Sequence, residues 1–345
     1  MTAAVDFDPV PPALESVLEP AWLAQALDLV GERDRVVGVE VVDSLATIAE
    51  KVRFVVSIED EGGRRTAHPL CAKGHFRGGF NSLGTEAHAY RHLLPELAVR
   101  TPRAHHVGID AAGDRGLIIM DDVIGLGGRI RSAHDTTSLE ACRASLSELA
   151  RLHASTWGDD RWDVPWLESR VARTSSMFPT DALQALLDDG RGAQVPNGLP
   201  DAPSLQAALV RTAELMPTCV VHGDTHSGNA YVDAADRVGW LDWQITQRGH
   251  WAIDISYHLG TVLDVDVRRT HEADLLGHYL IELAAYGASA PSFEDAWDSY
   301  AAGFTWGFFL WVITRISSRE VVLIHIPRLA AALSDHETFQ RLGVA

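Results

Sequence analysis

The chain has 345 residues, a length typical of two domains or of two lobes of one unit. Its formal net charge is −18, and because such a field repels phosphate backbones, we expect no nucleic-acid partner. Hydrophobic residues make up 46% and charged residues 22% of the chain, which are ordinary proportions for a globular protein with material for two cores.

The cysteines and the first residues indicate where the protein works. The three cysteines lie far apart and none belongs to a Cys-x-x-Cys pair, which excludes a disulfide framework or zinc site and favours a reducing cytoplasm. The first residues include acids where a signal peptide needs a basic start and an apolar run. The most apolar stretch, 303–314, is too short to span a bilayer, so we expect no membrane partner.

The first third of the chain reads mainly as β-structure. Apolar residues at helical spacing predict a short helix over 20–30, and a glycine pair predicts a turn over 60–65. Valine-rich and β-branched runs around that turn are typical of strands. We expect strands over 36–42, 51–58, 70–73 and 117–120, and a further helix over 85–94.

The rest of the chain reads mainly as helix. A glycine-rich crossing at 125–128 precedes a strongly amphipathic helix over 139–157. Short strands are expected only over 218–243. These patterns predict an α+β protein with an N-terminal sheet lobe, 1–123, and a larger, mostly helical lobe, 124–345.

One segment concentrates the residues suited to chemistry. A buried strand over 218–221 ends at the sequence His222-Gly-Asp224, where side chains are held by a rigid scaffold. Two short strands follow, over 230–232 and 238–241, and the turn between them makes them a hairpin. The end of the first strand and the open end of this hairpin are therefore the expected site.

Oxygen ligands are expected to meet at the open end of the hairpin, where Asn229 and Asp242 would lie opposite each other. Amide and carboxylate oxygens suit magnesium, which needs only one or two protein ligands because waters and phosphates complete its shell. Asp224 on the adjoining loop can accept the proton of an attacking hydroxyl. A base and two metal ligands are parts that phosphoryl transfer requires.

These motifs carry a resemblance to a known family. The HGD motif at Asp224, with Asn229 and Asp242 after it, resembles the catalytic and metal-binding segments of the aminoglycoside phosphotransferase and choline kinase superfamily. The sequence HGDTHSGN followed by LDWQ is most similar to the motifs of the ecdysteroid-kinase-like and macrolide-kinase-like branches of this superfamily. The resemblance implies a protein-kinase-like two-lobe fold with an antiparallel sheet in the N-terminal lobe. It also implies an enzyme that uses ATP and Mg²⁺ to phosphorylate a small-molecule hydroxyl.

The resemblance further implies a role for each motif residue. Asp224 would be the catalytic base, and Asn229 and Asp242 the magnesium ligands. We expect His222 and Asp254 to brace the loops around the site and not to react.

The N-terminal lobe should hold the nucleotide. Lys73 ends an otherwise apolar strand, and Glu86 opens the next helix within TEAHAY, which resembles the family's E-x-x-x-Y helix start. The pair is therefore interpreted as the clamp on the α- and β-phosphates. The segment 120–123 resembles the hinge whose main-chain groups bind the adenine edge. The hinge residues are Met120, Asp121 and Asp122.

The hairpin expected to cover the phosphates departs from the usual kinase-like pattern. Residues 42–50 contain no glycine, so close approach of the backbone to a phosphate is harder. The hydroxyls of Ser44 and Thr47 are the groups that can donate hydrogen bonds there instead.

Two alternatives stay open. The sequence GDTH at 223–226 looks like part of a metallophosphoesterase site, although the chain lacks the further Asp and His clusters of that class. The other alternative is a kinase-like fold that binds a ligand without chemistry. The missing glycine loop favours it, whereas the intact lysine, asparagine and aspartates of the site argue against it.

The helical pattern over 297–312 bears on the acceptor. Its apolar stripe is typical of core, yet the helix is apolar around most of its girth and must be covered on several sides or line a cavity. In the resembled family such helices help to build the acceptor pocket, so we expect a neutral or weakly cationic, partly apolar alcohol. An aminoglycoside is the second candidate, because acids could receive its ammonium groups. These acids are Asp264, Asp266, Glu272 and Asp274.

Overall fold

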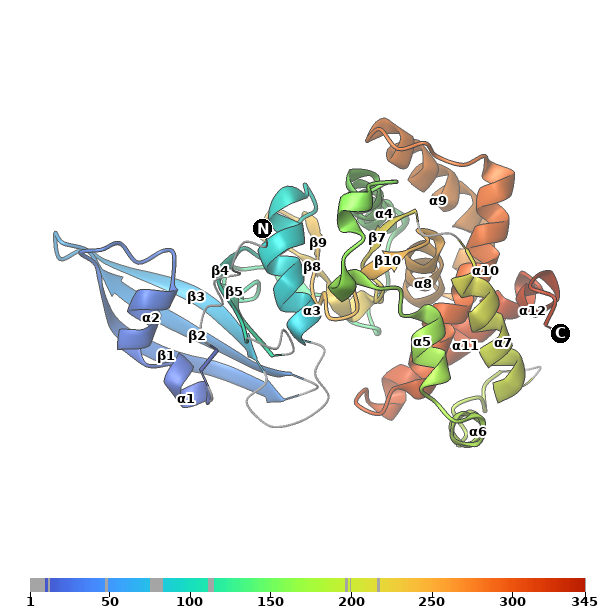
Figure 1. The fold of residues 1–345 in the computed structure, drawn as a ribbon, viewed down its shortest axis with the longest axis horizontal. Coiled ribbons are helices and arrows are strands. Elements are labelled where there is room, and N and C mark those ends of the chain that lie inside the picture. Colours follow the sequence, from blue (N-terminus) through green and yellow to red (C-terminus); the bar gives the residue numbers. More distant parts are fainter. Residues whose placement is uncertain are drawn as a thin grey trace. The chain divides into compact units, whose positions relative to one another are not determined.

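Figure 1 shows the fold as a computed structural model, which describes residues 10–344 except 12, 47–48, 75–82, 111–114, 196–197, 199 and 216–217. The chain forms two compact units. The N-terminal unit comprises Met1–Arg129 and Val232–Gln244, and the helical unit comprises Ile130–Tyr231 and Ile245–Ala345. Each unit thus consists of two segments of the chain, because Val232–Gln244 groups with the N-terminal unit. The predicted lobes 1–123 and 124–345 are each a single continuous segment, and their roles in nucleotide and acceptor binding stay a prediction.

The N-terminal unit is built on a five-stranded sheet. Its strand order is β1-β2-β3-β5-β4, and neighbouring strands pair antiparallel. The strands are β1 (Arg35–Ala46), β2 (Glu50–Glu59), β3 (Arg65–Gly74), β4 (Ala104–Ile109) and β5 (Gly116–Asp121). The predicted strands are therefore present, and several of them are longer than the sequence pattern indicates.

Alternation along β2 creates the core of this unit. Every second residue from Val52 to Ile58 is buried, so β2 presents one apolar face. Two short helices, α1 (Leu14–Val17) and α2 (Pro20–Ala26), supply Val17, Leu23 and other apolar side chains to the same cluster. Lys51 and the residues that alternate with the buried ones along β2 belong to the opposite face of the sheet.

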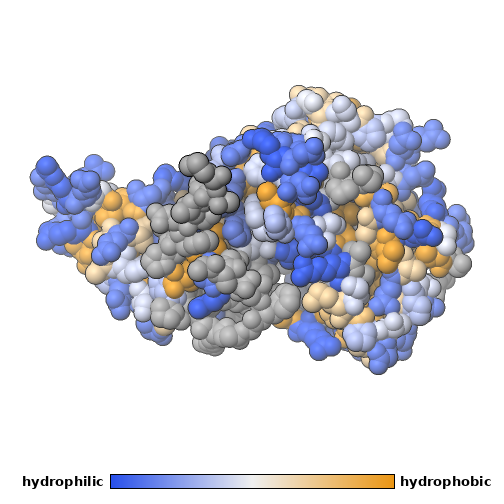
Figure 2. Space-filling model, viewed as in Figure 1, coloured by the Kyte–Doolittle hydropathy of each residue, from blue (hydrophilic) through white to orange (hydrophobic). Residues whose placement is uncertain are grey.

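The turn between β2 and β3 is polar and exposed, as its sequence predicts. Asp60 Oδ1 accepts hydrogen bonds from the N–H groups of Gly62 and Arg64. Glu61 forms an exposed ion pair with Arg33 at 2.9 Å. In Figure 2 this tip of the N-terminal unit is blue, in contrast to the orange patches beside it.

The predicted helix over 85–94 consists of three consecutive pieces. α3 (Leu83–His88) passes into a π-helical turn, Ala89–Leu93, and then into a 3₁₀ turn, Leu94–Glu96. Pro95 lies in the last piece, and a proline lacks the N–H that a continuing α-helix needs. α3 packs on β4 and β5.

The helical unit contains the remaining long elements. Its helices are α4 (Leu139–Ser155), α5 (Val171–Ser176), α6 (Thr180–Leu187), α7 (Ala202–Ala213), α8 (Ala252–Val262), α9 (Val265–Ala285), α10 (Phe293–Ile313), α11 (Arg319–Asp335) and α12 (Thr338–Arg341). β7 (Cys219–Val221) pairs antiparallel with β10 (Gln247–Gly249). The other short strands of the chain are β6 (Arg129–Ile130), β8 (Ala230–Val232) and β9 (Val238–Trp240). The α+β class is confirmed.

α10 is a long helix of this unit with most of its residues buried. It packs against α7, α8 and α11, and Figure 1 shows it running among them. The predicted stripe is buried at Ala301, Phe304 and Phe308, and so are Tyr300 and Phe309 off the stripe. The all-round apolar character of the helix is therefore explained mainly by core packing.

Among the described residues, no helix combines the length and the apolar character needed to cross a membrane.

Candidate active site

The HGD loop begins with a sharp turn at the end of β7. Gly223 has φ +84°, a left-handed conformation that side chains with a Cβ rarely adopt. A Cβ at this position would lie 2.5 Å from the carbonyl oxygen of Ile245, so the close approach of the two backbones also requires glycine. The strand can therefore end abruptly and turn the next residue, Asp224, out of the sheet.

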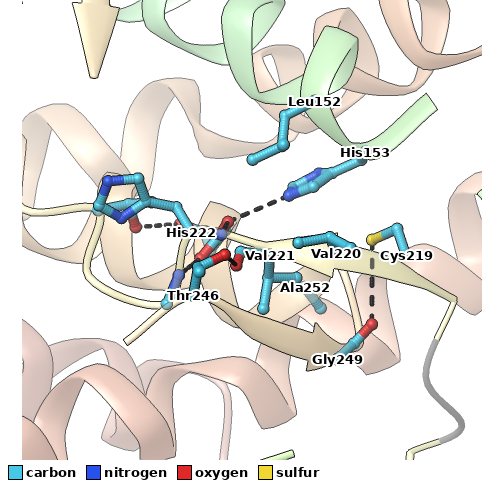
Figure 3. Close-up of polar contacts among 12 residues, drawn as sticks. Leu152, His153, Cys219, Val220, Val221, His222, Thr246, Gly249 and Ala252 are labelled. Atoms are coloured by element: carbon cyan, nitrogen blue, oxygen red, sulfur yellow. Dashed lines mark hydrogen bonds and ion pairs between the residues drawn. The ribbon is translucent and has the colours of Figure 1, made fainter. Parts of the chain in front are cut away.

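Asp254 holds this turn from the first turn of α8. Its Oδ2 accepts a hydrogen bond from the N–H of His222 at 2.7 Å, and its Oδ1 accepts one from the N–H of Gly223 at 2.8 Å. His153 of α4 donates from Nε2 to the same carboxylate at 3.1 Å, as Figure 3 shows for the residues around His222. Asp254 is completely buried. The predicted bracing role of Asp254 is confirmed.

His222 and α10 fix the rest of the loop. Nδ1 of His222 accepts a hydrogen bond from the N–H of Asp224 at 3.2 Å, so His222 braces the loop as predicted. The indole Nε1–H of Trp306 donates to the carbonyl of Gly223 at 2.8 Å. The sequence pattern placed Trp306 off the apolar stripe but could not show that it anchors this loop.

Asp224 presents a carboxylate held by neutral donors. The hydroxyl of Tyr257 donates to Oδ1 at 2.8 Å, and Nδ2 of Asn229 donates to Oδ2 at 2.9 Å. The Asp224 side chain keeps 27% of its surface exposed. A carboxylate oxygen has more than one lone pair, so Asp224 can still accept a proton from a bound hydroxyl.

The orientation of the Asn229 amide follows from its partners. Nδ2 donates to the main-chain carbonyl of Asp224 as well as to its carboxylate, each at 2.9 Å. Both partners are acceptors, so the nitrogen must face them and the amide oxygen points elsewhere. That oxygen is the atom that suits a hard metal ion.

An aromatic group borders Asp224. Nδ1 of His226 accepts the N–H of Gly228 at 3.1 Å, which leaves the proton of the neutral ring on Nε2, and this atom lies 3.7 Å from Asp224 Oδ2. The His226 ring centroid lies 5.3 Å from that of Trp311 and 6.2 Å from that of Tyr257. The C-terminal part of α10 therefore reaches the neighbourhood of the candidate base.

The N-terminal unit contains the residues predicted to bind the nucleotide phosphates, and they form a cluster of charges. Lys73 Nζ lies 2.6 Å from Glu86 Oε2 and 2.9 Å from Asp242 Oδ1. The side chains of Lys73 and Glu86 are 3% and 1% exposed, so both charges are taken out of water and depend on their partners. The predicted pairing of Lys73 with Glu86 is confirmed, and Asp242 joins it.

Lys51 belongs to the same cluster and was not predicted from the sequence. It pairs directly with Lys73 across β2 and β3, so the two side chains share one face of the sheet. Lys51 Nζ lies 3.2 Å from Asp242 Oδ2. Each Asp242 oxygen thus has its own lysine. Alternation along β2 indicates that Lys51 points away from the core, but only the register shows what it faces.

The cluster shifts the protonation of its members. Burial alone would lower the pKa of Lys73, but the Asp242 and Glu86 carboxylates outweigh it and raise this pKa above its usual value. Burial would raise the pKa of Asp242, but Lys73 and Lys51 hold it well below its usual range. Asp242 is therefore a carboxylate anion, which is the form that a metal ion or a lysine binds.

Ser44 does not share the sheet face of this cluster. It pairs with Val52, whereas Lys51 pairs with Leu45, so Ser44 projects from the face opposite to the two lysines. A bulge between Val41 and Asp43 shifts the register by one residue. Without that bulge Ser44 would lie opposite Lys51. Thr47 lies outside the described residues.

The hinge segment is tied into the sheet. The N–H of Asp121 donates to the carbonyl of Arg103 at 2.9 Å, and the N–H of Asp122 donates to the carbonyl of Pro69 at 3.1 Å. Met120 is paired within β5. A base edge would therefore have to use main-chain groups of this segment other than these two donors. Binding of adenine here stays a prediction.

The two metal-ligand candidates belong to different units, since Asn229 lies in the helical unit and Asp242 in the N-terminal unit. Their predicted approach across the hairpin stays a prediction. Within the described part of the chain, no group of three or more His, Cys, Asp or Glu side chains is arranged to hold a metal ion.

The sequence between residues 49 and 301 matches the phosphotransferase enzyme family, APH. The chain belongs to this family. The match includes both the lysine cluster and the HGD loop, so membership replaces the metallophosphoesterase alternative. No curated protein matches the chain.

Solved structures of kinases are similar to this APH family member in fold. An ethanolamine kinase of Plasmodium vivax has a TM-score of 0.54 at 13% identity, covering 85% of this chain and 81% of that chain. The choline kinase LicA of Streptococcus pneumoniae has a TM-score of 0.50 at 13% identity, and the match covers 87% of this chain and 94% of that chain. At such identities the likeness concerns the fold, and the predicted kinase-like fold is confirmed.

Proposed function

We propose that this APH family member transfers the γ-phosphate of ATP to a hydroxyl of a small molecule. The observation that carries the proposal is the Asp224 carboxylate, partly exposed at a rigid strand end and held on both oxygens by donors. The oxygen of the acceptor hydroxyl would attack the γ-phosphorus while ADP leaves, and Asp224 would accept the proton that this hydroxyl loses.

The lysine cluster supports the nucleotide half of the proposal. Lys73, held by Glu86, would bind the α- and β-phosphates, and Lys51 offers a second ammonium on the same face of the sheet. A second lysine would supply part of the phosphate contact that a glycine-rich loop provides in other kinase-like folds. Base binding by the hinge segment 120–122 belongs to this proposal.

The residues present fit a magnesium ion. The Asn229 amide oxygen and the ionised Asp242 carboxylate are hard oxygen donors, and magnesium takes few protein ligands. A bound Mg²⁺ would neutralise charge on the phosphates. In the N-terminal unit, Lys73 and Lys51 would then turn from Asp242 towards the phosphates that they neutralise.

The acceptor would be a neutral or weakly cationic, partly apolar alcohol. His226, Trp311 and Tyr257 give the surroundings of Asp224 an aromatic character. Two of the acids that could favour an aminoglycoside are already engaged. Glu272 is buried against Arg268 at 2.7 Å, and Asp264 forms an ion pair with Arg328. The resemblance to the macrolide-kinase-like and ecdysteroid-kinase-like branches supports the same direction.

Free thiols fit a reducing cytoplasm as the place of action, because Cys71, Cys142 and Cys219 are all unpaired with one another.

ADP release against a panel of hydroxyl compounds tests the proposed function. With ATP and Mg²⁺ present, we expect release that depends on a partly apolar alcohol. Strong turnover of kanamycin-like polycations with none of apolar alcohols would reject the proposed acceptor class and keep the transferase. Binding of ATP and ligand with no ADP release on any acceptor would favour the ligand-binding alternative.

A further inference from the structure

The hydroxyl of Tyr257 is the least expected partner of Asp224. Tyr257 follows Asp254 by three residues on α8, so both side chains lie on one face of that helix. Asp254 binds the backbone of the HGD loop, and Tyr257 binds the carboxylate that the loop presents, at 2.8 Å. One helix therefore fixes both the loop and its reactive side chain.

The Tyr257 ring is seated by a glycine of α10. A Cβ on Gly307 would lie 2.5 Å from Cδ2 and 2.7 Å from Cγ of the Tyr257 ring. The ring fills the space that the missing side chain leaves, and Tyr257 is only 1% exposed. Because the ring cannot swing away, the hydroxyl has a fixed direction.

Burial and the nearby Asp224 raise the pKa of Tyr257 well above its usual value. The hydroxyl therefore keeps its proton and acts as a donor to the carboxylate. The carboxylate plane of an aspartate turns easily about its last bond, and such side chains populate broad minima. Two donors on two different oxygens, from Tyr257 and Asn229, restrict this rotation.

We infer that Tyr257 is a positioning residue that, with Asn229, holds the Asp224 carboxylate towards the acceptor hydroxyl. The inference rests on the proposed function. Tyr257 itself would touch neither substrate, so its effect would appear in the rate of transfer and not in nucleotide binding.

Tyr257→Phe is the direct test, because phenylalanine keeps the ring in its seat at Gly307 and removes only the hydroxyl. We expect kcat to fall about tenfold or more, the loss typical of one hydrogen bond to a charged group. The Kd for ATP and Mg²⁺ should stay within about twofold of wild type, because the lost bond lies outside the nucleotide contacts.

Tyr300→Phe is the matched control. Tyr300 is also completely buried, and its hydroxyl donates to the Glu272 carboxylate at 3.0 Å. The same atom is removed from the same kind of bond, so both variants should lose similar thermal stability. Only Tyr257→Phe should lose turnover.

The double variant Asp224→Asn, Tyr257→Phe separates positioning from general damage. If Tyr257 acts through Asp224, adding Tyr257→Phe to Asp224→Asn should leave kcat unchanged within about twofold. A further tenfold loss of kcat in the double variant, or a wild-type kcat in Tyr257→Phe alone, overturns the inference. In both cases turnover by the wild-type protein still upholds the proposed function. A wild-type protein without turnover on the panel rejects the proposed function and the inference together.

Discussion

The two halves of the proposed site, one in each unit, hold their carboxylates in different ways. In the N-terminal unit, Asp242 is held by two lysine charges at 2.9 and 3.2 Å. In the helical unit, Asp224 is held by the neutral donors Tyr257 and Asn229. A metal ion can replace the lysines as the partner of Asp242, and phosphates can replace Asp242 as the partner of the lysines. The hydrogen bonds from Tyr257 and Asn229 to Asp224 allow a single arrangement. The first half is therefore suited to ligand exchange, and the second to fixed geometry.

Asp242→Asn tests the exchangeable half and should have the largest effect. Asp242 has φ +63°, and asparagine tolerates this left-handed conformation, so the fold should persist. The loss of the negative charge removes the proposed metal ligand. We expect no magnesium-dependent ATP binding in calorimetry. Unchanged affinity and metal dependence in the variant would remove Asp242 from the metal site.

Asp254→Ala tests the fixed half through stability. The change leaves the buried N–H groups of His222 and Gly223 without acceptors, and each such loss costs about 1–3 kcal/mol. We expect a decrease of roughly 2–5 kcal/mol in the free energy of unfolding, measured in urea. Asp266→Ala is the control, because that side chain is 95% exposed and should change stability little. Equal stability of the two variants would contradict the frame described for the HGD loop.

The lysine cluster should respond in a graded series. Lys73→Met should raise the ATP KM or suppress kcat most strongly, because Lys73 is buried between two carboxylates. Glu86→Gln should do the same less severely. Lys51→Met should have the smallest effect of the three, since the Lys51 side chain is 31% exposed. Steady-state kinetics decide the order, and a Lys73 variant with normal kinetics would show that another residue binds the phosphates.

A histidine of the N-terminal unit should give the smallest effect, on the pH dependence of stability. Burial opposes the charging of His105, but its hydrogen bonds to Asp121 and Asp28 outweigh burial and raise its pKa. Charged His105 therefore stabilises the fold. This stabilisation is fully present below the pKa of the unfolded state, near 6.5, and is lost as the pH rises through the higher pKa of the folded state. His105→Gln should lose about 1 kcal/mol or less of stability at pH 6 and less at pH 9. A loss that is equal at both pH values would contradict the charged state of His105.

The sequence predicts much of each half and misses what depends on register and helix packing. Asp224, Lys73 with Glu86, and the bracing role of Asp254 follow from local motifs. A phosphate contact of Ser44 stays a prediction, and the bulge before Asp43 places Ser44 opposite Val52 and not opposite Lys51.

Two further residues could not be identified from the sequence. Lys51 needs the pairing of β2 with β3 to be known. Tyr257 needs the seat at Gly307, fifty residues further along the chain. Long-range pairings of this kind have no local signal in the sequence.

Asp224→Asn is the most direct test of the proposed chemistry, measured as kcat for ADP release beside the Kd for ATP with Mg²⁺. Asparagine keeps the size of the side chain but cannot accept the proton. We predict a loss of roughly 10²–10⁴-fold in kcat with nucleotide affinity close to wild type. A kcat within about tenfold of wild type would contradict the role of Asp224 as the base that accepts the acceptor's proton.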